Sequence, residues 1–416
     1  MRVIADLHVH SKYARATSAS CDIPGLAQGA KIKGINIMAT GDFTHPEYFN
    51  ELTGFLAKNE VSDGEFYSYD GIRFILSTEV AVIYELDGKT KKMHHILLAP
   101  SLEIAAQINE QLNKYGKLKE DGRPILKMSS AELVGQLESI SKDIAIIPAH
   151  VWTPWFAIFG SKSGVDSVEE AFEDKSDRIF ALETGLSSDP TMNWMISKLD
   201  KYSLISNSDA HSLGKLGREA NVFELNEMTF EAVINAIKTR KGFVKTYEFY
   251  PEEGKYHYDG HRKCNILWPP WESEQHKNIC PVCKRKVTVG VMHRIADLAD
   301  RKLGEKPEGA VPFQQIVPLV TIISKTIKKG EATQATGEKY DHLIRYFGNE
   351  FAVFEANEEQ LRLATTPEIA ASIIKVQKGD IRWIPGYDGV FGELVLDSSK
   401  ISKNISDGKQ KSLGDF

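Results

Sequence analysis

Eight side chains in the first half of the sequence are of the kinds that bind divalent metals. Most of them follow a short apolar run, such as residues 3–4 or 144–147, and therefore lie where a buried strand would end. They are His8, His10, Asp42, Glu79, His95, His150, Asp209 and His211. Because the carboxyl ends of parallel strands meet at one face of an α/β barrel, we expect these side chains to converge. Mixed imidazole and carboxylate ligands suit Zn, Mn or Fe better than Mg alone, so the pattern predicts a metal-dependent hydrolase.

Four of these ligands form two pairs with one residue between them, His8-x-His10 and Asp209-x-His211. Alternate residues of a strand point to the same face, so each pair can reach one ion. A single pair of this kind often arises on a protein surface without any function. The two pairs together, with single carboxylates and histidines at the strand ends between them, indicate a metal site.

Three positions leave alternatives open. Asp42 is interpreted as a ligand, although it could instead cap the helix that follows it. His94 and His95 are adjacent, so only one of them can face the site from a strand. We choose His95 because it immediately precedes the apolar run 96–98. Glu183 ends another predicted strand and is expected to support a ligand rather than to bind metal itself.

Strands and helices alternate from residue 1 to about residue 244, which predicts right-handed βα units and a parallel sheet. We expect the sheet to close into a barrel of about seven strands. The predicted strands are 2–8, 35–40, 72–78, 144–148, 179–183, 204–208 and 222–225. The predicted helices are 24–33, 46–58, 102–115, 130–141, 168–173, 190–201 and 230–241. The fold class is therefore α/β.

Length, charge and cysteine content bound the remaining possibilities. A chain of 416 residues suits two or three domains. No stretch is long enough to span a bilayer, and no signal-type segment precedes the first strand, so no membrane partner is expected. Four cysteines, three of them clustered, favour a metal site over a disulfide framework and predict a cytoplasmic location. The net charge is −6, but Lys and Arg outnumber Asp and Glu between residues 236 and 306, which favours a polyanionic partner.

A second metal site is indicated by the spacing His261-x2-Cys264-x15-Cys280-x2-Cys283. Two ligand pairs with a mid-length spacer fit a tetrahedral, structural Cys3His zinc site. His257, His276 or His293 could replace His261 as the fourth ligand. A redox dithiol would need a thioredoxin-like context, which the sequence does not provide.

We predict four segments: a metallo-phosphoesterase barrel (1–245), a zinc-binding module (246–295), a helical accessory domain that binds DNA (296–397) and a tail (398–416). The accessory domain contains predicted helices at 312–328, 338–347 and 367–378. The tail is rich in Ser, Lys, Asp and Gly and is expected to be disordered.

The ordered motifs of the first 245 residues resemble the PHP (polymerase and histidinol phosphatase) domain. The matching segments are Asp6-Leu7-His8-Val9-His10, Thr40-Gly41-Asp42, Glu79, His95, His150 and Ser208-Asp209-Ala210-His211. The resemblance implies a distorted (β/α)7 barrel with two to three divalent ions (Zn, Mn, Mg or Fe). Residues 13–17 depart from the Ser-Asp-Gly that many relatives carry after the first motif, so the third ion is the doubtful one.

Over almost the whole chain the sequence resembles the endonuclease Q family of archaea and some bacteria. The segments that carry this resemblance are 149–155, 183–189, 216–219, 260–264 with 280–283, 290–294 and 385–389. It implies a DNA repair endonuclease that cleaves 5′ to a deaminated base (hypoxanthine, uracil or xanthine) or an abasic site. Asp42, Glu79 and Asp209 would then be the catalytic carboxylates, with Glu79 bridging two ions that activate a water molecule.

Damaged DNA, double- or single-stranded, would be the partner, and its target base would be inspected outside the stack. The candidates for lesion and DNA contacts are Tyr13, Arg15, Trp152, Trp155, Phe156, Trp268, Trp271, Lys284, Arg285 and Lys286. The aromatic residues among them could instead pack their loops onto the protein.

The C-terminal residues Gln410, Leu413 and Phe416 are spaced like the motif with which repair enzymes bind the sliding clamp PCNA. Two rival interpretations remain. A PHP phosphatase for a small phosphate monoester would explain the barrel, but not the zinc module or the tail. A clamp-tethered DNA-binding scaffold would not need the full set of barrel ligands.

Overall fold

The computed structural model describes residues 1–56 and 66–396, and these form two compact units. Unit 1 comprises residues 1–185, 201–248 and 311–314, and unit 2 comprises 186–200, 249–310 and the remainder from 315. The predicted tail with its clamp motif (Gln410, Leu413 and Phe416) lies outside the described residues. So does the end of the predicted helix 46–58.

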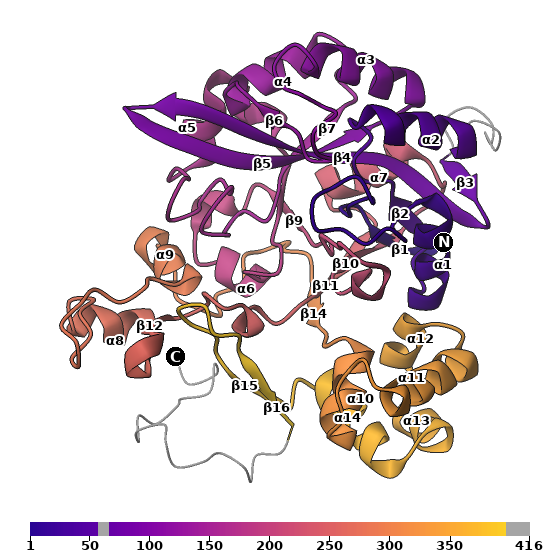
Figure 1. Ribbon diagram of the computed structural model, residues 1–416, viewed down its shortest axis with the longest axis vertical. Helices are drawn as coiled ribbons and strands as arrows, with labels where there is room; N and C mark the ends of the chain where they lie inside the picture. Colours follow the sequence, from indigo (N-terminus) through magenta and orange to yellow (C-terminus); the bar gives the residue numbers. More distant parts are fainter. Residues whose placement is uncertain (57–65, 397–416) are drawn as a thin grey trace. The chain divides into compact units, whose positions relative to one another are not determined.

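Unit 1 is built on one large curled sheet with the strand order β14-β11-β10-β1-β2-β4-β5-β7 (Figure 1). β3 and β6 pair with β4 outside this path. The strands are β1 (Arg2–Asp6), β2 (Ile37–Ala39), β3 (Tyr67–Tyr69), β4 (Ile72–Leu86), β5 (Lys89–Ala99), β6 (Ile125–Leu126), β7 (Ala145–Pro148), β10 (Ala220–Glu224), β11 (Phe243–Glu248) and β14 (Phe313–Gln315). β1, β2 and β4 are parallel neighbours, as predicted, and their inner residues are buried.

Two further strands, β8 (Ala181–Glu183) and β9 (Ser203–Ile205), form a separate parallel pair. Backbone hydrogen bonds beyond the strand ends connect this pair to the main sheet. Val151 N donates to Glu183 O at 3.0 Å beyond the end of β7, and Asp209 N donates to His8 O at 3.0 Å beyond the end of β1. The circuit β1-β2-β4-β5-β7-β8-β9 therefore returns to β1, and the curled sheet confirms the predicted α/β fold class. The seven strands are not those predicted, because β5 joins the circuit and the predicted strand 222–225 (β10) pairs with β1 on the side away from β2.

The expectation of a parallel sheet is wrong at β5, which runs antiparallel to both β4 and β7, and at β10, which runs antiparallel to β1. Figure 1 shows β4 and β5 side by side as one long hairpin. Its turn residues Asp87 and Gly88 have φ angles of 51° and 71°, the left-handed values that a tight hairpin turn requires. This hairpin sets which side of β5 faces the site.

Several helices of unit 1 begin at side-chain caps that the sequence provides. Asp22, Ser101 and Ser129 each accept a hydrogen bond from a backbone N–H of the first turn, and Ser129 forms a capping box with Glu132. The helices are α1 (Ile23–Lys33), α2 (Pro46–Leu56), α3 (Leu102–Leu112), α4 (Ser130–Glu138), α5 (Val168–Phe172) and α7 (Phe230–Thr239), with the 3-10 segments η2 (Glu173–Arg178) and η4 (Leu213–Lys215). Their buried apolar faces cover the sheet and fix the strand ends.

Unit 2 contains a small module with two short strands, two short helices and the four predicted zinc ligands. Its elements are η5 (Pro251–Glu253), β12 (Asp259–His261), η6 (Arg262–Cys264), β13 (Ile266–Trp268), α8 (Pro270–Gln275) and α9 (Val291–Leu298). The predicted helix 190–201 also lies in unit 2 and is wrong in its extent, because it breaks into α6 (Pro190–Asn193) and η3 (Ser197–Leu199).

A bundle of five helices and a hairpin complete unit 2 (Figure 1). They are α10 (Leu319–Ile327), α11 (Gln334–Phe347), α12 (Glu350–Glu355), α13 (Glu358–Ala364), α14 (Pro367–Gln377), β15 (Arg382–Ile384) and β16 (Glu393–Val395). Leu319, Ile323, Leu343 and Ile369 are fully buried at its centre. The helical C-terminal region of the predicted fold class is thereby confirmed. No helix among the described residues is long and apolar enough to cross a membrane.

Candidate metal centre

His8 and His10 follow β1 and are completely buried, and a carboxylate holds each imidazole by its Nδ1 atom. Nδ1 of His8 lies 3.0 Å from Glu183 Oε1, and Nδ1 of His10 lies 2.9 Å from Asp42 Oδ1. A hydrogen bond from Nδ1–H to a carboxylate leaves the lone pair of Nε2 free on the opposite side of the ring. This is the arrangement that prepares a histidine to bind a metal.

The free sides of both rings point to Asp209. One ligand atom from each of His8, His10 and Asp209 lies within 4.8 Å of the others. The closest approach is 3.1 Å, between His10 Nε2 and Asp209 Oδ1. Within the part of the chain that the structure describes, His8 Nε2, His10 Nε2 and Asp209 Oδ1 are buried without a hydrogen-bond partner. Buried polar atoms are rarely left so, and a divalent cation between them would satisfy all three.

A second group consists of Glu79, His94 and His150. Oε1 of Glu79 lies 2.7 Å from His94 Nδ1 and 2.9 Å from His150 Nε2. The other oxygen, Oε2, lies 3.3 Å from His10 Nε2. Glu79 therefore stands between the two groups, the position expected of a carboxylate that bridges two ions.

His94 occupies the place that was predicted for His95, and that prediction is wrong. In the antiparallel register of β4 and β5, Ala81 pairs with His94 and Val80 pairs with His95. Ala81 is two residues from Glu79 and shares its face, so His94 faces the site and His95 faces away. His95 Nε2 instead contacts Ser130 Oγ at 2.9 Å, and its ring packs near that of Phe172.

Asp42 lies behind His10, and its predicted role as a direct metal ligand is corrected. Oδ1 accepts a hydrogen bond from His10, while Oδ2 accepts two, from the backbone N–H (2.6 Å) and the hydroxyl (2.7 Å) of Ser11. Protein donors thus engage both oxygens, and Asp42 belongs to neither ligand group. Asp42 orients the ring of His10 in the way that Glu183 orients the ring of His8.

Hydrogen bonds to its backbone fix the turn that carries Asp209. Asp209 has a φ of 46°, and Arg218 donates to the carbonyls of Ser208 (2.8 Å) and Asp209 (3.3 Å). The buried Asp6 accepts a hydrogen bond from Ser208 N at 3.1 Å.

His211 follows in the same turn with its ring centroid 4.4 Å from that of His10, but it stands outside both ligand groups. Its role as a ligand therefore stays a prediction.

The site concentrates negative charge. Burial alone would raise the pKa of Glu79, but His94 and the hydrogen bonds of the other histidines hold that pKa well below 4.5. Burial alone would lower the pKa values of His8 and His10, but Glu183 and Asp42 reverse this and raise both well above 6.5. Burial lowers the pKa of His94 to about 4, so this ring is neutral at pH 7. The carboxylates therefore require either protons or cations among them.

Sequence reasoning missed Arg123, whose Nη1 lies 3.2 Å from Glu79 Oε2. It comes from the loop between α3 and β6, where no motif marks it. His94 had a signal, since it adjoins His95, but the strand pairing that selects between the two cannot be read from spacing alone.

The aromatic candidates near the centre divide by exposure. Trp152 is 1% exposed and packs on Phe159, so its prediction as a lesion contact is corrected. Trp155 is 57% exposed, and Phe156 lies with its ring 4.7 Å from that of His94. Tyr13 donates a hydrogen bond to Glu51 and stacks on His45, and the Arg15 side chain is largely exposed.

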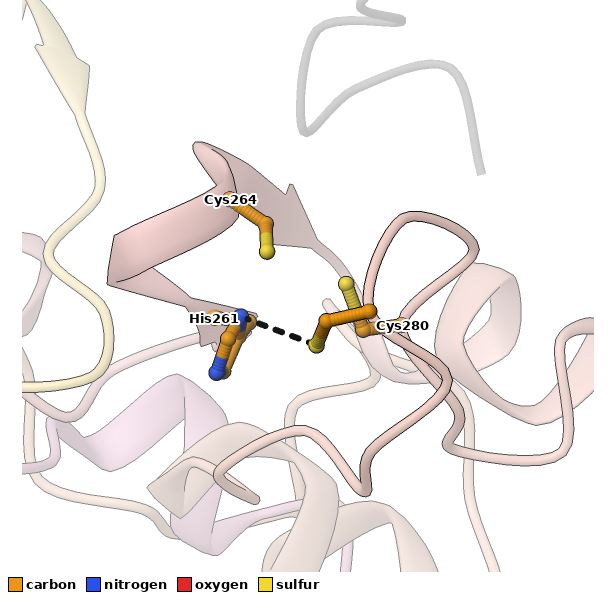
Figure 2. A group of neighbouring side chains, drawn as sticks. His261, Cys264 and Cys280 are labelled. Carbon is orange, nitrogen blue, oxygen red and sulfur yellow. Dashed lines mark hydrogen bonds between the residues drawn. The ribbon is translucent and has the colours of Figure 1, made fainter.

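In unit 2, one ligand atom from each of His261, Cys264, Cys280 and Cys283 lies within 4.8 Å of the others. Figure 2 shows Cys264 and Cys280 pointing toward the same place as His261. The cysteines are free thiols, and Cys283 Sγ lies 3.7 Å from His261 Nδ1. Tetrahedral zinc with Zn–S bonds of about 2.3 Å holds its ligand atoms at a separation similar to this 3.7 Å. The residues present therefore fit a structural zinc ion.

The three histidines considered as substitutes for His261 lie elsewhere: His257 is buried beside Tyr258, His276 stacks on Trp268, and His293 binds Asp259. Trp268 is buried in a small core with Cys280 and Val287, so its prediction as a DNA wedge is corrected. Trp271 and the three basic residues Lys284, Arg285 and Lys286 are exposed.

Comparison with known proteins finds two family models. One described as PHP-associated matches residues 201–241, and one described as the MJ0043 C-terminal domain matches residues 318–380. Among solved structures, the lesion-specific endonuclease PfuEndoQ from Pyrococcus furiosus is 31% identical, with a TM-score of 0.86 and 98% of each chain covered. Endonuclease Q in complex with a 27-mer duplex that carries an abasic lesion at its active site is also 31% identical, with a TM-score of 0.84, covering 98% of this chain and 100% of that one.

Two curated relatives carry no described activity. The uncharacterized protein MJ0043 of Methanocaldococcus jannaschii is 33% identical over 258 residues, which are 60% of this chain but 32% of that protein. The chain thus spans about a third of the length of MJ0043. The uncharacterized protein YqxK of Bacillus subtilis (strain 168) is 28% identical over 419 residues, covering 94% of this chain and 99% of that protein.

Proposed function

The chain belongs to the endonuclease Q family, and from this membership we propose that it is a DNA repair endonuclease. It hydrolyses the phosphodiester 5′ to a deaminated base, such as hypoxanthine, uracil or xanthine, or to an abasic site. The single observation that carries the proposal is the pair of ligand groups joined by Glu79. Two ions side by side are the arrangement that enzymes use to hydrolyse phosphodiesters.

In this proposal His8, His10 and Asp209 hold one divalent ion, and Glu79, His94 and His150 hold another. Zn, Mn, Fe or Mg would lower the pKa of a water molecule and neutralise charge on the phosphate oxygens. The donor set suits the first three metals better than Mg. A third ion would need His211, which is near the first group but outside it.

The carboxylates of the chain have different roles in this proposal. Glu183 and Asp42 keep the imidazoles of His8 and His10 in the required tautomer and orientation. Asp209 is the carboxylate best placed to orient the attacking water, because its side chain is 27% exposed whereas that of Glu79 is completely buried. Glu79 instead fixes the spacing of the two ligand groups.

A damaged nucleotide must leave the base stack before its phosphate can be aligned. Phe156 lies against His94 and the exposed Trp155 is its neighbour, so these two offer stacking surfaces beside the second ligand group. Tyr13 and Arg15 lie in the loop beside Asp42. The backbone N–H of Tyr13 donates to Ser11 Oγ, and that of Arg15 donates to Asp121 Oδ1. Their side chains offer further contacts to the DNA.

The zinc module supplies the second part of the DNA interface in this proposal. A closed Cys3His site stabilises a segment too short to have a large core. Lys284, Arg285 and Lys286 follow its last ligand and are exposed, as phosphate contacts must be. Trp271 is also exposed and offers a stacking surface. Cysteines that form a zinc site rather than a disulfide framework support a reducing, cytoplasmic location.

Docking to the sliding clamp PCNA through Gln410, Leu413 and Phe416 is supported by their spacing alone, since they lie outside the described residues. A chain without residues 405–416 is expected to lose clamp binding in a pull-down while it keeps its nicking activity on short duplexes.

The proposal is tested with duplexes that contain deoxyinosine, deoxyuridine, an abasic site or no lesion, each incubated with and without a chelator. We expect one nick, 5′ to the lesion, that disappears with chelation and is absent from undamaged DNA. Release of phosphate from small monoesters without nicking would favour the phosphatase. Lesion binding without hydrolysis, with metal only at the cysteines, would favour the scaffold.

A further inference from the structure

Arg123 brings a guanidinium group into the metal centre. Its Nη1 lies 3.2 Å from Glu79 Oε2, the oxygen that also lies 3.3 Å from His10 Nε2. Among the described residues, it is the one Lys or Arg that forms an ion pair with a carboxylate of either ligand group. Its side chain is 26% exposed, close to the 27% of Asp209. The guanidinium is thus partly open to solvent, as a group that meets substrate must be.

The backbone around Arg123 is anchored on both sides. Gly122 N donates to Tyr13 O at 3.0 Å, and Asp121 Oδ1 accepts hydrogen bonds from the backbone N–H groups of Arg123 (3.1 Å) and Arg15 (3.4 Å). A Cβ atom at position 122 would lie 2.6 Å from the carboxyl group of Asp42, so only glycine allows this approach. The loop is therefore locked against the carboxylate that orients His10.

The following residue completes the anchoring. Pro124 O accepts a hydrogen bond from Ala81 N at 2.9 Å, and β6 then pairs with β4. Ala81 lies two residues beyond Glu79 on that strand. The backbone of Arg123 is consequently anchored on two sides of the metal centre, and the fold thereby directs this residue toward the centre.

The chemistry of the group suits a phosphate better than a purely structural ion pair. A guanidinium carries five N–H donors in one plane, and only one of them reaches Glu79 in the structure. Its fork geometry matches two oxygens of a phosphate group. Negative charge on the non-bridging oxygens grows as hydrolysis proceeds, so a fixed cation at this place stabilises the transition state more than the ground state.

We propose that Arg123 is a catalytic residue that binds a non-bridging oxygen of the phosphate to be cleaved. This inference rests on the proposed function and names one residue of that same reaction. The rival role for Arg123 is to hold Glu79 in place, without touching the substrate.

The test uses the full chain and single-turnover nicking of a duplex with one abasic site. Arg123→Met removes the charge and keeps the apolar stem, and we expect a fall in the nicking rate of about 100-fold with little change in DNA affinity. Arg123→Lys, which keeps a point charge without the fork, should lie between. Lys117→Met is the matched control: it removes an exposed cation, paired with Glu120 in the same loop, and should nick like wild type.

Metal content and chemical rescue separate the two roles. Arg123→Ala should bind the same number of ions as wild type, and added guanidinium chloride should restore its rate at least about 10-fold, whereas ammonium chloride at equal ionic strength should not. Loss of bound metal, or no rescue, would assign Arg123 to the support of Glu79 and overturn the proposal. So would wild-type rates in Arg123→Met. Failure of the wild-type chain to nick any lesion would instead overturn the proposed function.

Discussion

Glu252 is predicted to make unit 2 less stable as the pH rises. Burial, with the nearby charge of Asp189, raises the pKa of Glu252 from 4.5 to about 7. Its Oε2 is buried without a hydrogen-bond partner among the residues described. The carboxylate form is therefore poorly solvated in the folded chain and well solvated in the unfolded chain.

The sign follows from proton binding. The folded state binds the proton more tightly than the unfolded state, so the stability linked to this group is fully present below about pH 4.5. It is lost as the pH rises through about 7. The change in pKa corresponds to about 3 kcal/mol at most, since a tenfold change in the equilibrium constant is about 1.4 kcal/mol. Glu252→Gln cannot ionise, so it should be more stable than wild type at pH 8 by about 2–3 kcal/mol and similar to wild type at pH 4.5.

The measurement is urea unfolding of wild type and Glu252→Gln at pH 4.5, 6.5 and 8, followed by the fluorescence of the tryptophans. Glu359→Gln, which removes an exposed carboxylate of α13, is the control and should track wild type at every pH. A difference between Glu252→Gln and wild type that stays constant across these pH values would refute the reasoning, because it would show that the proton is not involved.

Four further results are expected. Asp209→Asn should abolish nicking and leave DNA affinity largely intact, as measured by fluorescence anisotropy, because the residue serves chemistry rather than binding; retained turnover would contradict its assignment. His94→Ala should lose barrel metal in an elemental analysis whereas His95→Ala should keep it, and the reverse pattern would contradict the strand register. Cys280→Ser should lose one zinc per chain and unfold at a lower temperature, since metal binding is coupled to the folding of the module; unchanged zinc content would exclude the site. Neutralising residues 284–286 with Gln should flatten the plot of log affinity against log salt by about 0.9 for each phosphate that these side chains neutralise in the wild type, and an unchanged slope would remove them from the interface.

Local patterns in the sequence were sufficient for much of the architecture. The capping residues Ser101 and Ser129 precede helices that begin where predicted, because a cap acts on the backbone of the next few residues. The spacing of His261, Cys264, Cys280 and Cys283 predicts correctly that four ligand atoms lie together, although the segment between the two pairs contains β13 and α8. The period-two pair His8 and His10 likewise depends only on strand geometry, although which ions it binds is left to experiment.

Other features depend on residues far apart in the chain. Whether His94 or His95 faces the centre is set by the pairing of β5 with β4, and a shift of one residue would exchange them. Asp42 has the composition of a ligand, but the hydroxyl and N–H of Ser11 take one of its oxygens and His10 takes the other. The loop sequence around Trp152 allows either a lesion contact or packing, and the packing of its ring on Phe159 decides for the second.

The sequence by itself therefore determined the kinds of ligand, the class of fold and the zinc spacing, because each rests on short-range geometry along the chain. Only the tertiary structure decided which side chains meet. It turned His94 rather than His95 to the centre, set Asp42 behind His10, and brought Arg123 to Glu79 from 44 residues away. Such contacts arise from strand register and loop anchoring, which depend on the free energy of the whole fold. They therefore leave no periodic pattern in the local sequence from which they could be predicted.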